Sequence, residues 1–305
     1  MKKTGAKYLT IKRVGIVFLT LFVFLICFPT GTWAKKKTVD IIVFTGQSNM
    51  MGHGNADEAP KLKKNAGYAY LPVTGKGRLS ELWEPFGKDE HEGDFCNIYG
   101  DENLVTGSMV TAFVNAYYTQ TGTPVVAVPA GLNGSGSLMW KTKHYKAVAR
   151  RVNAAKKAAK KKFKIGHVYM VWLQGESDAT AMQRNEDGTC ESGMTEAKYI
   201  SNVKGMFKKV KNKAKVSKCF VIRIPSYYGD NKDPYGTSWN TYFKKIQKAQ
   251  TNLCKDKNFV MVYSKTPSLG KSYMQQDYLH INQQGLNKIG KGAGKAAGKF
   301  ALKDK

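Results

Sequence analysis

Residues 39–50 read VDIIVFTGQSNM, an apolar run that ends in a glycine and a short polar turn. Two valines and two isoleucines among the first six residues are typical of a strand that is buried on both faces of a sheet. Gly46 permits a tight backbone turn after this strand. Ser48 then either caps the start of a helix, a role that serine often has, or projects its hydroxyl above the edge of the sheet.

Four more apolar runs follow, and they alternate with amphipathic segments. Strands are expected at residues 125–128, 167–173, 219–224 and 259–263, and helices at 104–120, 144–162, 195–213, 238–253 and 282–302. This alternation predicts an α/β fold, a three-layer α/β/α sandwich around a five-stranded, mainly parallel sheet. Residues 55–100 and 179–194 lack periodicity, and we expect both to be loops over the reactive edge of the sheet.

The first 34 residues have the pattern of an export signal. Lysines and Arg13 precede the apolar residues 14–28, and small residues surround a cleavage point near Ala34. The alternative is an uncleaved anchor, although the run is short for a membrane span of about 20 residues. We therefore expect a secreted or cell-surface protein with a signal peptide at residues 1–34, one domain at 35–305, and no membrane span after cleavage.

The formal net charge of +27 is unusual for 305 residues. Such a charge attracts polyanions, and an anionic cell-wall polymer or an acidic glycan is the partner that an exported protein would meet. The simpler interpretation is a solvated lysine surface, because the lysines lie on expected helix faces and at the chain's end. No sequence motif indicates nucleic-acid binding.

Four cysteines follow the expected signal, and an even number in an exported chain allows two disulfides. The pairs that we expect are Cys96–Cys190, between the two loops, and Cys219–Cys254, near the starts of two strands. Four buried thiols are the alternative. No ligand spacing for a metal and no phosphate-binding glycine loop is present in the sequence, so we expect neither a metal nor a cofactor.

Asp277 and His280 lie in the segment before the last expected helix. A serine nucleophile needs a base to take its proton, and neutral imidazole does this near pH 7. An aspartate three residues before the histidine can reach back to Nδ1 and hold the ring. Glu176, after the third strand, is an alternative acid for His280 or a structural carboxylate, and Asp277 is favoured by its spacing.

Three motifs carry a resemblance to a known family: residues 45–50 (TGQSNM), 172–178 (WLQGESD) and 277–282 (DYLHIN). In this order they resemble the sialate O-acetylesterase-type domain of carbohydrate esterase family 6, in the SGNH hydrolase superfamily. The resemblance covers about residues 39–290. It implies a flavodoxin-like sandwich with Ser48 as nucleophile, His280 as base and Asp277 as its partner.

The resemblance also implies an oxyanion hole made by the Ser48 N–H, Gly134 and Gln174. The chain reads Asn133-Gly134 where the family usually has two glycines. Trp140 matches the tryptophan after the family's glycine turn, and with Gln47 and Asn49 it is expected near the substrate. The expected function is hydrolysis of O-acetyl esters on carbohydrate, and the alternative is a non-catalytic, basic surface protein that binds anionic polymer.

Overall fold

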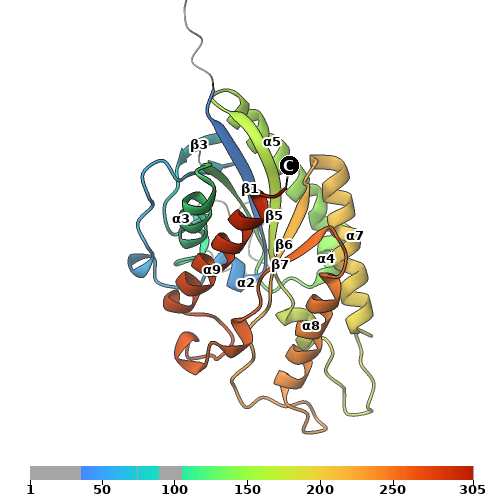
Figure 1. Ribbon diagram of the computed structural model, residues 1–305. Helices are drawn as coiled ribbons and strands as arrows, with labels where there is room; N and C mark the ends of the chain where they lie inside the picture. Colours follow the sequence, from blue (N-terminus) through green and yellow to red (C-terminus); the bar gives the residue numbers. More distant parts are fainter. Residues whose placement is uncertain (1–35, 74, 89–104, 305) are drawn as a thin grey trace, which may run out of the picture. The chain divides into compact units, whose positions relative to one another are not determined.

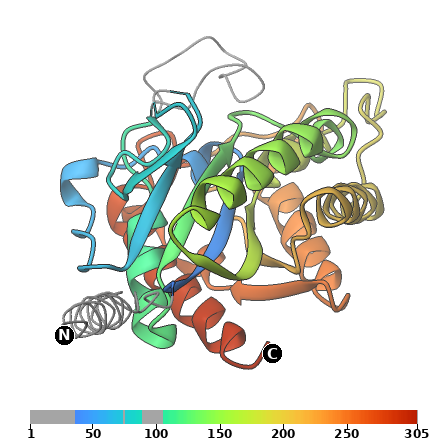
Figure 2. The same ribbon diagram turned by 90° about the horizontal axis from the view of Figure 1, so that it is seen from above.

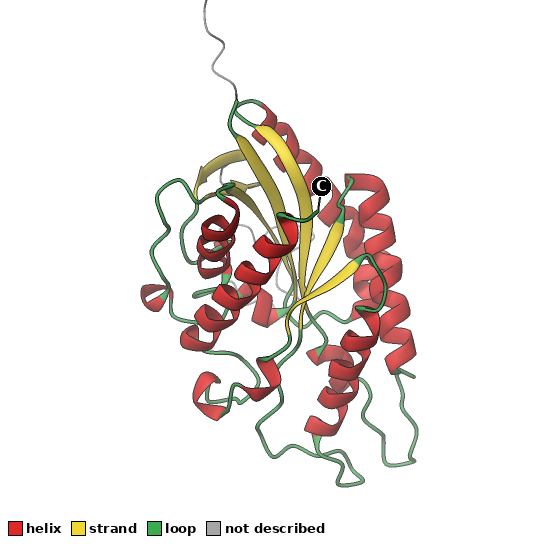
Figure 3. Ribbon diagram, viewed as in Figure 1, coloured by secondary structure: helices red, strands yellow, loops and turns green. Residues whose placement is uncertain are grey.

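The computed structural model describes residues 36–73, 75–88 and 105–304. The described residues from 37 onward form one compact unit, built on a sheet with helices on both of its faces (Figures 1 and 3). The seven strands of this sheet are β1 (Thr38–Gly46), β2 (Gly67–Leu71), β3 (Arg78–Glu81), β4 (Val125–Gly131), β5 (Lys164–Leu173), β6 (Lys218–Ile222) and β7 (Phe259–Tyr263).

The strands lie in the order β3-β2-β4-β1-β5-β6-β7, and only β3 pairs in the antiparallel sense. The five strands expected from the sequence form its β4-β1-β5-β6-β7 part, which is the flavodoxin-like order. Gly46 at the end of β1 is level with Gly131 of β4 and Leu173 of β5. The loops that leave these three strands therefore emerge side by side at one edge, which we call the carboxyl edge.

The sheet has seven strands where the sequence predicted five, because β2 and β3 lie inside the segment 55–100 that was expected to be a loop. Both strands are short, and β3 has no fully buried residue. Tyr68 and Ala69 of β2 pair with Val126 and Ala127 of β4. Backbone pairing of β2 with β4, and of β3 with β2, thus stabilises the two strands, and such pairing leaves little trace in the hydrophobic pattern.

The longer helices cover the two faces of the sheet (Figure 2). One face carries α3 (Val110–Thr121) and α9 (Gln283–Ala301), and the other carries α5 (Tyr145–Lys160), α7 (Glu196–Ala214) and α8 (Trp239–Leu253). Glycines in α9 let it approach α3 closely: a Cβ on Gly294 would lie 2.1 Å from the carbonyl oxygen of Phe113. The core between the layers includes Phe44, Trp140 and Trp172, each at most 1% exposed.

Neither expected disulfide is present among the described residues, because Cys190, Cys219 and Cys254 all carry free thiols. Burial raises the pKa of the Cys219 thiol, and burial also raises that of Cys254 to about 12, so both sulfurs stay protonated and inert at neutral pH. Cys96 and the expected signal at residues 1–34 lie outside the described residues. Within the described part of the chain, no helix is both long enough and apolar enough to cross a membrane.

Candidate active site

Ser48 lies where β1 turns into the short helix α2 (Ser48–Met51). Gly46 makes this turn possible: its φ is +147°, and a Cβ there would lie 1.9 Å from the carbonyl oxygen of Leu173. The Gln47 N–H donates to that same oxygen at 3.2 Å, which ties the turn to the end of β5. Ser48 is therefore fixed at the carboxyl edge, with 3% of its surface exposed.

His280 and Asp277 form the pair that their spacing predicts. His280 Nδ1 lies 2.6 Å from Asp277 Oδ2, and the N–H groups of Leu279 and His280 both donate to Oδ1 at 2.9 Å. Partial burial alone would raise the pKa of Asp277, but the hydrogen bonds from His280 and from the two backbone groups outweigh it and hold the pKa well below its usual range. Asp277 is thus a carboxylate that orients the imidazole through Nδ1. Nε2 is then the ring nitrogen that is not engaged by Asp277.

Asn49 joins the serine turn to the histidine loop. Its Nδ2 donates to the carbonyl oxygen of Leu279 at 3.3 Å, and its Oδ1 accepts from the N–H of Ile281 at 2.9 Å. Leu279 and Ile281 are the two neighbours of His280, as Asn49 is the neighbour of Ser48. These bonds therefore hold the loop of His280 against the turn of Ser48, although the two residues are far apart in the sequence.

Glu176, the alternative acid, has a different environment. It begins the short helix α6 (Glu176–Thr180), is 2% exposed, and accepts a hydrogen bond from Asn49 Nδ2 at 2.8 Å through Oε1. Burial raises the pKa of Glu176, and its Oε2 has no hydrogen-bond partner. Glu176 thus supports the Asn49 bridge, whereas Asp277 holds Nδ1 of His280.

The Gln174 side chain is part of the frame of the site. Its Nε2 donates to Ser135 O at 2.9 Å and to Asp178 Oδ2 at 2.5 Å, and it also lies 3.2 Å from Gln47 Oε1. An amide NH₂ has two hydrogens, and here both are directed at protein acceptors. The geometry therefore does not support the expected use of Gln174 as an oxyanion donor.

Gly134 remains a candidate donor on the turn after β4, where its φ of +62° is one that favours glycine. This turn is held to the segment after β5 through Asp178, whose carboxylate accepts from the N–H of Ser137 at 2.9 Å and from its hydroxyl at 2.5 Å. The backbone N–H groups at this turn therefore have a fixed position at the carboxyl edge.

Three residues expected near the substrate prove to be buried parts of the frame. Gln47 Oε1 accepts from Gln174 and also lies 3.2 Å from the N–H of Ser177. Trp140 is fully buried and donates from Nε1 to Ser135 Oγ at 2.8 Å. With Asn49 engaged by the histidine loop, all three position the site and have little surface for a ligand.

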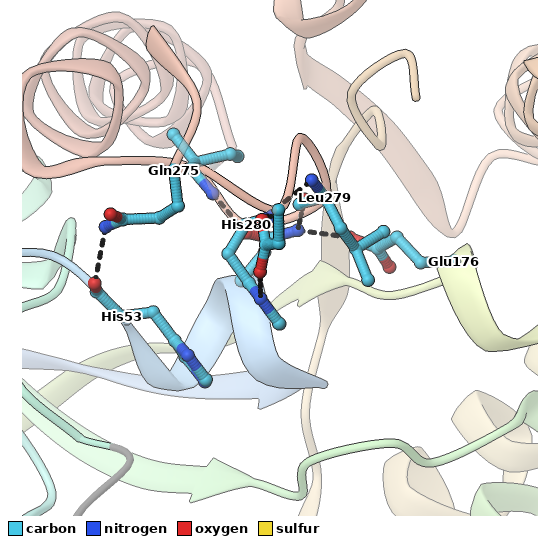
Figure 4. A network of polar contacts seen from close by, with 8 residues as sticks. His53, Glu176, Gln275, Leu279 and His280 are labelled. Carbon is cyan, nitrogen blue, oxygen red and sulfur yellow. Dashed lines mark hydrogen bonds and ion pairs between the residues drawn. The ribbon is translucent and has the colours of Figure 1, made fainter. Parts of the chain in front are cut away.

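His53 is the site residue that the sequence reasoning missed. Its ring stacks on that of His280, with the centroids 4.1 Å apart and the planes at 4° (Figure 4). Gln275 connects the same two residues: Nε2 donates to His53 O at 2.8 Å, and the N–H donates to His280 O at 2.6 Å (Figure 4). No pattern in the sequence predicts a ring contact between residues so distant along the chain.

A mainly parallel sheet with a serine after its central strand and a histidine–aspartate pair in the loop before the last helix is an arrangement suited to a serine hydrolase. The chain belongs to the family described as carbohydrate esterase, sialic acid-specific acetylesterase, whose model matches residues 38–299. It is accordingly a carbohydrate acetylesterase by family. No curated protein matched the chain.

The protein of Arabidopsis thaliana described next supports the fold, and two carbohydrate esterases are less similar in structure. A protein of Arabidopsis thaliana is 20% identical, with 87% of this chain and 98% of that chain covered and a TM-score of 0.59. A catalytic mutant of the acetylxylan esterase Axe2 from Geobacillus stearothermophilus is 14% identical, covering 85% and 94% with a TM-score of 0.46. A carbohydrate acetylesterase from Xanthomonas citri is 13% identical, covering 87% of this chain and 56% of its own at a TM-score of 0.47.

Proposed function

We propose that the protein hydrolyses O-acetyl esters on carbohydrate through an acyl-enzyme on Ser48. Ser48 Oγ bonds to the acetyl carbon while His280 Nε2 takes its proton, and the same nitrogen then returns a proton to the departing sugar oxygen. Water, deprotonated by His280, next attacks the acetyl carbon; the bond from that carbon to Ser48 Oγ breaks, His280 returns the proton to Oγ, and acetate leaves. Asp277 holds the ring through Nδ1 and stabilises the imidazolium that forms in each half.

The observation that carries this proposal is the Asn49 bridge between the Ser48 turn and the loop of His280. Together with the bond from His280 Nδ1 to Asp277, it supports a nucleophile and an oriented base at one edge of the sheet. The alternative function is binding without catalysis. A protein that only binds has no need of an oriented base beside a serine.

Oxyanion stabilisation is assigned to backbone groups. The Ser48 N–H is the first of α2, and the N–H of Gly134 lies on the turn that Asp178 holds in place. Each well-placed donor of this kind contributes about 2.7–4 kcal/mol to the stabilisation of the transition state. Gln174 contributes indirectly, because its amide fixes Asp178 and Gln47.

The acetylated glycan and the place of action are also part of the proposal. The candidate substrates are acetylated xylan, O-acetylated sialic acid and acetylated wall sugars. Measuring acetate release from each of the three substrates shows which one the protein cleaves. Export follows from the signal pattern at residues 1–34, with the protein acting outside the cell or at its surface. N-terminal sequencing of secreted protein should find a start just after Ala34.

The catalytic proposal is tested by Ser48→Ala. The protein should hydrolyse p-nitrophenyl acetate, and Ser48→Ala should lower kcat/KM by at least about 10³-fold, because the nucleophile is lost. Ser201→Ala, an exposed serine on α7, is the matched control and should leave the rate unchanged. Equal rates for Ser48→Ala and Ser201→Ala would contradict the proposed mechanism.

A further inference from the structure

The neighbouring helices α5 and α7 carry an unusual density of positive charge. Eleven lysines and arginines lie between residues 141 and 164, and eight lysines lie between residues 197 and 218. The sequence has no aspartate or glutamate from residue 103 to 175, nor from 197 to 229. Because α5 and α7 pack against each other on one face of the sheet, these two basic segments form one surface, which we call the basic seam (Figures 1 and 2).

The basic seam contains a groove of about 390 Å³. Lys146 and Arg150, one helical turn apart on α5, line it together with Lys213 from the end of α7. Asn153 closes the groove between the helices, since its Nδ2 donates to the carbonyl oxygen of Lys213 at 3.1 Å. Cations from two elements therefore converge on one concave surface.

Positive charge is crowded enough along the basic seam to affect individual side chains. Desolvation lowers the pKa of Lys156, and the charges of Lys160 and Lys215 lower it further. Lys156 Nζ donates to the carbonyl oxygen of Ala214 at 3.1 Å, so this repulsion acts across the boundary between the helices. A bound polyanion would relieve it, because a negative charge beside several like charges stabilises all of them.

The basic seam begins near the carboxyl edge of the sheet. Lys141, just before α5, donates from Nζ to Asn202 Oδ1 at 3.3 Å, and Asn202 Nδ2 donates to Ser137 Oγ at 3.1 Å. Ser137 in turn binds Asp178 in the frame of the proposed catalytic site. A linear ligand along α5 and α7 would thus lead from this groove towards the turn that carries Gly134.

We propose that the basic seam binds a polyanionic glycan and guides its acetylated units to the carboxyl edge. This inference rests on the proposed function for the glycan's identity, because the reaction at the end of the seam is on carbohydrate esters. A nucleic acid fits less well, since stacking on exposed aromatic rings is how proteins hold single strands. The large exposed apolar side chains of the described chain are Trp83, Leu138, Met139, Tyr235, Tyr278 and Leu302, and they lie outside α5 and α7.

The test compares two triple variants of the full chain, each made in the Ser48→Ala background so that bound glycan is not hydrolysed. The seam variant carries Lys146→Gln, Arg150→Gln and Lys213→Gln. The control variant carries Lys291→Gln, Lys295→Gln and Lys299→Gln, which removes the same charge from exposed lysines of α9 on the opposite face. Thermal melting of both variants checks that they fold.

Binding is measured by titration with acetylated polyuronate, with a phosphate-bearing glycan and with neutral acetylated xylan. The seam variant should lose at least about tenfold in affinity for an anionic glycan, and the control variant less than about twofold. The two anionic glycans separate carboxylate from phosphate recognition. Equal losses in both variants, or tighter binding of a DNA oligonucleotide than of either anionic glycan, would overturn the proposal.

The same substitutions with Ser48 restored separate this inference from the catalytic one. Hydrolysis of p-nitrophenyl acetate should be unchanged, whereas KM for an acetylated polyuronate should rise with kcat unaltered, because only the approach of the polymer is impaired. A protein that binds polyanions through the seam but cleaves no ester would refute the proposed function and leave the surface assignment standing. Unchanged KM with the polymer would refute guidance by the seam.

Discussion

Two carboxylic acids lie near His280, and their surroundings differentiate them. Asp277 is half exposed and receives three hydrogen bonds, one of them from the imidazole. Glu176 is buried, and its bond is to Asn49. Since water and N–H donors stabilise a carboxylate while burial disfavours it, Asp277 is the ionised partner of the histidine and Glu176 is a structural acid.

Replacing each of the two acids by its amide should separate these two roles. Asp277→Asn should lower kcat by about 10³–10⁴-fold, because an amide at this position no longer stabilises the imidazolium or selects its tautomer. Glu176→Gln should cost less than about tenfold, since the amide oxygen still accepts from Asn49. Steady-state kinetics on p-nitrophenyl acetate gives both values, and the reverse ranking would make Glu176 the acid of the triad.

His53 should act as a positioning residue, because its ring covers one face of the His280 imidazole. His53→Ala should lower kcat by between about 10- and 100-fold with little change in KM, since a base that is slightly misplaced loses efficiency. His53→Phe should recover most of the rate, because a flat ring restores the stacking. A phenylalanine variant as slow as the alanine variant would exclude a role for stacking.

At the scale of elements, the turn between β1 and α2 is the most constrained connection at the site. Gly46 approaches the carbonyl oxygen of Leu173 so closely that no side chain fits, and its φ is one that other residues avoid. The position of Ser48 therefore depends on glycine two residues earlier. The same kind of approach lets α9 pack on α3, at Gly290 and Gly294.

Gly46→Ala should destabilise the fold by more than about 3 kcal/mol, because it adds a clash with the backbone of β5 to an unfavourable φ. Urea unfolding measures this free energy. Gly122→Ala is the matched control: Gly122 also has a positive φ, +66°, but a Cβ there meets nothing within 4 Å. Its cost should be about 1 kcal/mol, and equal costs at both glycines would show that the contact with Leu173 is unimportant.

Most elements could be predicted because their signals are local. Thr195 and Asn282 were expected at the starts of helices, and their side chains accept from the N–H groups of Lys198 and Gly285 as N-caps do. The two strands β2 and β3 could not, because β2 depends on pairing with β4, and β3 on pairing with β2, more than on their own hydrophobic pattern. The π-helical turn at Trp140–His144 before α5 has no such local signal either.

For the whole molecule, the order of the strands controls both the proposed catalysis and the proposed binding. Because β1 lies between β4 and β5, the loops of all three strands meet where the order of connection reverses, and this is where parallel sheets bind ligands. The same winding places α5 and α7 together, so the lysines and arginines of these two helices lie on the same side of the sheet. If that surface binds a polyanionic glycan, the affinity should fall steeply as salt is added, because screening weakens exposed charges.

The sequence by itself determined the five strands β4, β1, β5, β6 and β7, their helices, and the pairing of Asp277 with His280, because periodicity, caps and a three-residue spacing are local properties. Tertiary structure alone decided that the amide of Gln174 donates to Asp178 and that Gln47 and Trp140 are buried. It also decided that His53 stacks on His280 and that the three described cysteines, Cys190, Cys219 and Cys254, are free. These outcomes depend on which distant groups meet when layers pack. A hydrogen bond or a ring contact between remote segments is a property of the packed sheet and has no counterpart in the order of residues.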